Sequence, residues 1–226
     1  GAVTSEGELT DYSTPGASVL ISAPSSGGVS GGLTTQDLPG AVGYSTGDTT
    51  SSFGGTSAAT PQVSGVEALM LEANPNLGWR DVKMLLAMSS QTLDVAGQVT
   101  NGATNWNGGG MVFSNDIGFG VLDARAAVRL AETWLETSTS ANEVSTSGSL
   151  KTTTSIVDNK TTDLKITLAA GVDIETMSLD LTGFHGRMTD LTIQLISPSG
   201  TVSTLLANQA SSTSLKGWTF TSNAFL

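Results

Sequence analysis

Apolar residues along this chain recur with different periods in different regions. In residues 1–53, short apolar runs stand between glycine, proline and serine, and residues 18–22 are typical of a short strand. In residues 56–135, apolar side chains return every three or four positions, which predicts helices. In residues 156–226 they alternate with polar side chains, which is the period of half-buried strands. This order predicts a strand-and-helix segment followed by an all-β segment.

The helical signal is strongest in three stretches of the middle region, residues 57–73, 79–88 and 123–135. Asp123 opens the third stretch and is a residue type that favours the N-cap of a helix. Residues 137–155 are rich in serine and threonine and carry few large apolar side chains, so we interpret them as a linker. We therefore expect a first domain over residues 1–136 and a second over residues 156–226.

Strand signals dominate after the linker. Apolar residues alternate with polar ones in residues 164–168 and again in residues 191–195. Residues 197–200, Ser-Pro-Ser-Gly, are typical of a turn between two strands. Residues 224–226 are expected to lie within a further strand. Because a sandwich needs two facing sheets, the second domain is expected to be an incomplete β-sandwich.

Composition excludes some classes of function. The chain has 226 residues, a formal net charge of −11, one histidine and no cysteine. An acidic chain repels nucleic acid phosphates and anionic membranes, and a chain without cysteine has no disulfide framework. No apolar run is long enough to cross a bilayer. We therefore expect neither a nucleic acid partner nor a membrane span in this segment.

The candidate chemistry lies in residues 53–61, Phe-Gly-Gly-Thr-Ser-Ala-Ala-Thr-Pro. Glycines before Ser57 allow a sharp backbone turn, and small residues after it allow a helix to pack closely. Ser57 is then expected at a helix N-terminus, where free N–H groups and the helix dipole stabilise an oxyanion. A serine N-cap on a buried helix is the alternative that an isolated Gly-Thr-Ser leaves open.

The same stretch resembles the subtilase serine signature, Gly-Thr-Ser-x-Ala-x-Pro, which is carried here by Gly55, Thr56, Ser57, Ala59 and Pro61. Residues 71–82 and 118–124 resemble the runs that follow the nucleophile in kexin- and furin-like subtilases. Residues 190–201 resemble a hairpin of the P domain that follows the protease in proprotein convertases. The resemblance implies an α/β fold, the C-terminal half of a doubly wound parallel-sheet domain, followed by a partial all-β, jelly-roll-like P domain.

By this resemblance Ser57 is a nucleophile that forms an acyl-enzyme, and its backbone N–H is an oxyanion donor. The family's catalytic Asp, catalytic His and oxyanion-hole Asn are expected upstream of Gly1. The chain alone is therefore expected to be inactive and to need the N-terminal part of the same protease. The single histidine, His185, matches a P-domain strand and turn, and we assign it a structural role.

The resemblance also implies calcium in the intact protein. A family stretch that often contributes a glutamate ligand aligns with residues 12–16, where Thr14 offers only a neutral oxygen. Acidic residues after the linker, such as Asp158 and Asp180, are interpreted as a solvated face. No metal ligand is therefore assigned.

The function expected for the intact protein is that of a serine endopeptidase acting on polypeptides, and the resemblance implies cleavage after basic residues. A secreted or extracytoplasmic location of bacterial type is expected with it. One alternative is a catalytically inactive relative whose P domain binds proteins, which upstream sequence without the Asp or His would indicate. A second alternative, a β-sandwich adhesion protein, has no use for a glycine-flanked serine at the start of a buried helix.

Overall fold

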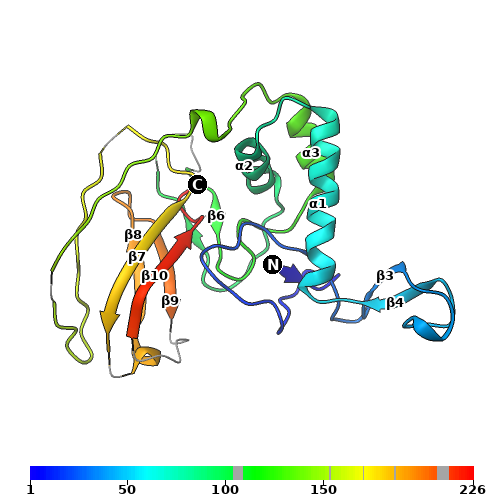
Figure 1. The fold of residues 1–226 in the computed structure, drawn as a ribbon, viewed down its shortest axis with the longest axis horizontal. Coiled ribbons are helices and arrows are strands. Elements are labelled where there is room, and N and C mark those ends of the chain that lie inside the picture. The colour runs from blue at the N-terminus through cyan, green and yellow to red at the C-terminus, as the bar shows by residue number, and fades with distance from the viewer. Residues whose placement is uncertain (104–108, 153, 170, 186, 208–213) are drawn as a thin grey trace.

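In the computed structural model, the chain is described for residues 1–226 except 104–108, 153, 170, 186 and 208–213. Figure 1 shows a helical part, with α1 (Thr56–Ala73), α2 (Trp79–Ser89) and α3 (Ala124–Glu132), beside a part made of strands. These helices agree closely with the three predicted stretches. Asp123 accepts a hydrogen bond from the Ala126 N–H (2.8 Å), which confirms its role as N-cap. None of the described helices is apolar and long enough to cross a membrane.

The parallel sheet of the first half is short. Strand β1 (Ala2–Val3) pairs in parallel with β2 (Ala23–Pro24), and Ser22 forms a parallel bridge with Val121. The predicted strand over residues 18–22 is wrong, because only Ser22 joins the ladder. The backbone before it is in a turn, in which the Val19 N–H donates to the Gly16 carbonyl.

The described residues of this half also form two antiparallel pairs. They are β3 (Leu33–Gln36) with β4 (Thr49–Phe53), and β5 (Val99–Thr100) with β6 (Val112–Phe113). The β3–β4 hairpin extends away from the N-terminal end of α1 (Figure 1). Its β4 strand ends at Phe53, so the chain enters α1 through only two glycines, Gly54 and Gly55.

The helices enclose the main apolar core. Met70 of α1 and Leu85 of α2 are fully buried against Ala127 of α3. Phe113 and Phe119 belong to the same core and pack edge to face, with ring centroids 5.3 Å apart. The apolar stripes that predicted the helices are therefore the surfaces that hold them together.

In the second half, the described residues form two antiparallel strand pairs. Strand β7 (Met177–Phe184) pairs with β10 (Ser214–Ser222), and β8 (Thr192–Ile196) pairs with β9 (Val202–Ala207). The alternation predicted for residues 191–195 is confirmed, since every second side chain there faces inward. The side chain of Met188 is buried among apolar residues of these strands and their connections, namely Leu181, Leu191, Ile193, Leu206 and Phe220. This packing is that of a partial sandwich.

Two other predictions for this half concern strands and turns. The turn at residues 197–200 is confirmed, because the Ser197 N–H donates to the Thr201 carbonyl (2.9 Å) and closes the β8–β9 hairpin. The strand predicted over residues 164–168 is wrong, and Leu164 is 54% exposed there. This segment lies against the backbone near Gly148 without forming a strand ladder. An alternating pattern cannot form a sheet without a partner strand.

Residues 224–226 also differ from expectation. Strand β10 ends at Ser222, and the following residues turn into the first half, where Ala224 and Leu226 join the main core. Asn223 holds this turn, since its N–H donates to the Ala17 carbonyl (2.9 Å) and its side-chain amide to the Ser18 carbonyl (2.8 Å). These residues act as an anchor between the halves and not as a strand.

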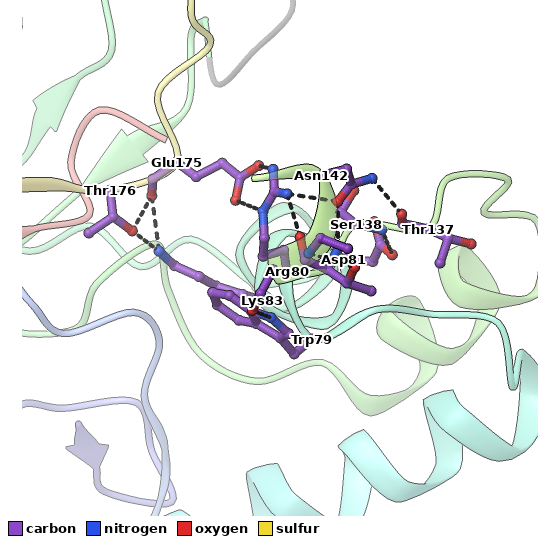
Figure 2. Close-up of polar contacts among 12 residues, drawn as sticks. Trp79, Arg80, Asp81, Lys83, Thr137, Ser138, Asn142, Glu175 and Thr176 are labelled. Carbon is purple, nitrogen blue, oxygen red and sulfur yellow. Dashed lines mark hydrogen bonds and ion pairs between the residues drawn. The ribbon is translucent and has the colours of Figure 1, made fainter. Parts of the chain in front are cut away.

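A second connection between the halves lies at the start of α2 and is drawn in Figure 2. Arg80 Nε donates to Glu175 Oε2 (2.8 Å), and its Nη2 contacts the other carboxylate oxygen. Lys83 Nζ donates to the Glu175 carbonyl (2.9 Å) and to the Thr176 hydroxyl. We call Arg80, Lys83, Glu175 and Thr176 the α2–β7 cluster, because Thr176 directly precedes β7.

The first residues of the predicted linker pack on the same helix. Asp81, which is buried, accepts hydrogen bonds from the N–H groups of Gly78 (2.8 Å) and Ser138 (2.7 Å) and from Trp134 Nε1 (3.0 Å). Burial would raise the pKa of Asp81, but the three donors together lower it below its ordinary value. The linker is therefore attached to α2 at its start, whereas residues 143–150 are mostly exposed.

Candidate active site

Ser57 lies at the second position of α1, and its side chain is exposed. The helix is preceded by Gly55, whose φ of 77° lies in the left-handed region that residues with a side chain rarely adopt. Thr56 is the first helical residue. The turn expected from the glycines is therefore present, and it directs the chain into the helix immediately before Ser57.

Ser57 lies in the first turn of α1, at the positive end of the helix dipole. Within the described part of the chain, neither its N–H nor its hydroxyl takes part in a hydrogen bond. The next N–H, that of Ala58, donates to the Gly55 carbonyl (3.0 Å) and starts the helix. A free N–H beside a free hydroxyl at a helix N-terminus can bind an oxygen that gains negative charge.

The small and rigid residues of the motif serve the packing of the helix. Ala59 is buried against Ala2 of β1 and Ala23 of β2, so a larger side chain would push α1 away from the sheet. Pro61 is the sixth helical residue and has no N–H, which leaves the Ser57 carbonyl without its usual partner four residues on. The packing explains the small residue at Ala59, whereas Pro61 is tolerated at the cost of one hydrogen bond in the second turn.

Residues that follow β2 hold the entry to α1. The Ser25 hydroxyl donates to the Gly55 carbonyl (2.7 Å), and the Gly55 N–H donates to the Ser26 hydroxyl (3.1 Å). The side-chain amide of Gln62 donates to the Pro24 carbonyl (2.6 Å), which adds a third hydrogen bond. Sequence analysis missed Ser25 and Ser26, because a serine pair in a serine-rich chain carries no signal of its own.

His185 does not reach this site. It follows β7 in the sandwich, and its Nδ1 lies 2.8 Å from the Arg187 carbonyl oxygen and accepts the Arg187 N–H (3.2 Å). Figure 1 shows β7 and the start of α1 in different parts of the molecule. The structural role predicted for His185 is consistent with these local bonds, and the described residues place no other imidazole beside Ser57.

The described residues contain no cluster of acidic, histidine or cysteine side chains that could bind the expected calcium ion. Thr14 is exposed in the loop after β1, and no group of three or more His, Cys, Asp or Glu side chains there could hold an ion. A groove of about 770 Å³ lies beside α2 and α3 and is lined in part by Arg80, Trp134 and Glu175, not by the residues around Ser57. The described residues therefore offer no acidic ligand set to which the calcium expectation could be assigned.

Comparisons with known proteins agree with this geometry. The sequence profile of the "Subtilase family" matches residues 1–120, and that of the "Proprotein convertase P-domain" matches residues 174–226. Neuroendocrine convertase 2 of Drosophila melanogaster is 33% identical over 214 residues, which cover 91% of this chain and 31% of that protein. The Aeromonas extracellular serine protease of Aeromonas sobria is 30% identical over 249 residues, which cover 91% of this chain and 39% of that protein.

A solved structure shows the same arrangement of both halves. The crystal structure of the serine protease of Aeromonas sobria superimposes with a TM-score of 0.74 at 26% identity, covering 99% of this chain and 47% of that one. This chain thus spans less than half the length of the proteins it matches. Since the family profile covers more than half of its residues, the chain belongs to the subtilase family, with a proprotein convertase P-domain after its α/β half.

Proposed function

We propose that the protein containing this chain is a serine endopeptidase in which Ser57 attacks the peptide carbonyl. The observation that carries the proposal is the exposed Ser57 at a helix entered through Gly55 with its positive φ; among the described residues neither its hydroxyl nor its N–H has a hydrogen-bond partner. Attack by Ser57 Oγ opens the carbonyl, and the oxygen that becomes negative accepts the Ser57 N–H. The base that took the Ser57 proton gives it to the departing amine, which leaves an acyl-enzyme on Ser57 that water hydrolyses.

A serine hydroxyl needs a base to take its proton. We assign this base, the aspartate that orients it and the oxyanion-hole asparagine to further residues of the protein. The length of the relatives supports this assignment, because the chain spans only 31% and 39% of two of them. The polypeptide that carries those residues is thus the partner that this chain needs for activity.

Polypeptides are the substrates that we propose. Cleavage after basic residues is supported by the similarity to a convertase. An extracytoplasmic location of bacterial type is supported by the similarity to an extracellular protease of Aeromonas sobria. Calcium remains a proposal for the intact protein alone, without an assigned ligand and without a step in this mechanism.

The test compares three forms of the full-length protein, unchanged, Ser57→Ala and Ser64→Ala. Ser64 is an exposed serine of the same helix and provides the matched control. With a fluorogenic dibasic peptide, Ser57→Ala is expected to lose activity on the order of a thousandfold or more, and Ser64→Ala is expected to keep it. Ordinary turnover by Ser57→Ala would place the nucleophile elsewhere.

The separate 226-residue chain supplies the second arm of the test. It is expected to show no hydrolysis and no labelling by a fluorophosphonate probe above its own Ser57→Ala form, because Ser57 then has no base. If the full-length protein is also unreactive toward both peptide and probe, the alternative of an inactive relative that binds proteins through its P domain is supported instead.

A further inference from the structure

We infer that Ser25 and Ser26 are positioning residues for Ser57, a role that rests on the nucleophile proposed above. We call these two side chains the serine pair. Their hydroxyls bond the N–H and the carbonyl of Gly55, the residue that turns the chain into α1. By fixing the backbone of that glycine, they determine the orientation of the first turn of α1, which carries Ser57.

The two hydrogen bonds constrain different backbone torsions of Gly55. The Ser26 hydroxyl accepts the Gly55 N–H (3.1 Å), on the φ side of the residue, and the Ser25 hydroxyl donates to its carbonyl (2.7 Å), on the ψ side. Gly55 has a φ of 77°, but a glycine adopts many other backbone conformations about as readily. The residue type alone therefore does not keep Gly55 in this conformation. The serine pair therefore supplies a restraint that the glycine lacks.

The carbonyl held by Ser25 is also the acceptor that begins the helix. It accepts the Ala58 N–H (3.0 Å) from the residue directly after Ser57. A rotation of the Gly55 carbonyl would therefore move the first helical turn, together with the Ser57 hydroxyl and N–H. Catalysis by an oriented nucleophile is sensitive to such motion, since a displacement of ~1 Å can cost ~100-fold in rate.

The serine pair is itself held by the rest of the fold. Ser25 is 2% exposed, and its N–H donates to the Val3 carbonyl of β1 (2.7 Å). The Ser26 carbonyl accepts the Tyr12 hydroxyl (2.5 Å). On the other side, a β-carbon at Gly54 would lie 1.9 Å from the Ser26 hydroxyl oxygen, so only glycine permits this approach. The serine pair thus connects strand β1 to Gly55 at the start of α1 through hydrogen bonds.

The experiment measures turnover in the full-length protein with Ser25→Ala, Ser26→Ala and the double variant. Active sites are counted by burst titration, and kcat is expressed per titrated site, so misfolded molecules do not contribute. We expect kcat to fall ~10-fold in each single variant and ~100-fold in the double variant, with KM within about twofold of its starting value. Ser64→Ala is the matched control and is expected to keep kcat.

A purely structural role predicts a different result. It would lower the melting temperature and the number of titrated sites, and it would leave kcat per site unchanged. Unchanged kcat in the double variant, or a change confined to KM, would overturn the inference. The Ser57→Ala variant in the same series distinguishes failure of the proposed function from failure of the positioning role. If Ser57→Ala retains activity, the proposed function is wrong. If Ser57→Ala is the only variant that loses activity, the positioning role alone is wrong.

Discussion

The α2–β7 cluster offers a sharp test of how the two halves of this chain hold each other. Glu175→Gln keeps the shape of the carboxylate and removes its charge, and Arg80→Ala removes the guanidinium that contacts it. Arg80 also donates to the Thr139 carbonyl (3.0 Å) and to Asn142 Oδ1 (3.1 Å), so its loss removes two hydrogen bonds to the linker as well (Figure 2). We expect both changes to lower the free energy of unfolding, with Arg80→Ala having the larger effect.

The magnitude follows from the exposure of the pair. The side chains of Arg80 and Glu175 are 13% and 23% exposed, between a surface pair and a fully buried one. Surface pairs contribute about 0.2–1 kcal/mol, and breaking a buried pair costs about 3–5 kcal/mol. We therefore expect a loss of about 1–2 kcal/mol for Glu175→Gln and about 2–3 kcal/mol for Arg80→Ala. Their coupling energy should be about 1–2 kcal/mol.

The assay is a double-mutant cycle by urea denaturation of the 226-residue chain, followed by circular dichroism. Arg129 and Glu132 provide a matched control within α3, because they also form an ion pair but are 72% and 39% exposed. Their coupling should be about 0.3 kcal/mol and should vanish in about 1 M salt, where screening acts within ~3 Å. A coupling at Arg80 and Glu175 no larger than that of the control would refute the argument.

Two further predictions concern the linker and its contact with α2. Limited proteolysis with mass mapping should cut first within residues 143–150, because they are mostly exposed. Residues 137–142 should be spared, because they are hydrogen-bonded to α2. Early cuts inside α1 would contradict this prediction. The lowered pKa of Asp81 means that its carboxylate stabilises the fold above the ordinary pKa of about 4, and that this contribution is lost as the pH falls through the folded-state value. In urea titrations, the free energy of unfolding of Asp81→Asn should therefore fall less at acidic pH than that of the unchanged chain. An equal fall in both would show that other groups cause the loss of stability in acid.

Features set by neighbouring residues were predictable from the sequence. The three helices follow from apolar spacing along the chain, and the N-cap at Asp123 and the turn at residues 197–200 depend only on bonds to residues close by. The glycine turn before Ser57 belongs to the same class, since a left-handed backbone at Gly55 requires glycine whatever the rest of the molecule does. In each case the physical cause lies within a few residues of the feature.

Strands could be predicted only in part, because a strand requires a partner. Residues 191–195 and residues 164–168 show the same alternation, yet only the first forms a strand, β8, which pairs with β9. The second lies partly exposed without a ladder, and nothing in its own residues distinguishes it. Likewise, Ala224 and Leu226 join the main core instead of continuing a strand, because apolar residues distant in the sequence surround them there.

The tertiary structure alone decided which polar side chains meet. The serine pair reaches Gly55 across 29 and 30 residues, and Arg80 reaches Glu175 across 95. Serine and threonine are abundant throughout the sequence, so no residue type marks the two serines that hold the entry to α1. A hydrogen bond depends on distance and direction in space, and these become defined only when the sheet, the helices and the sandwich have packed together.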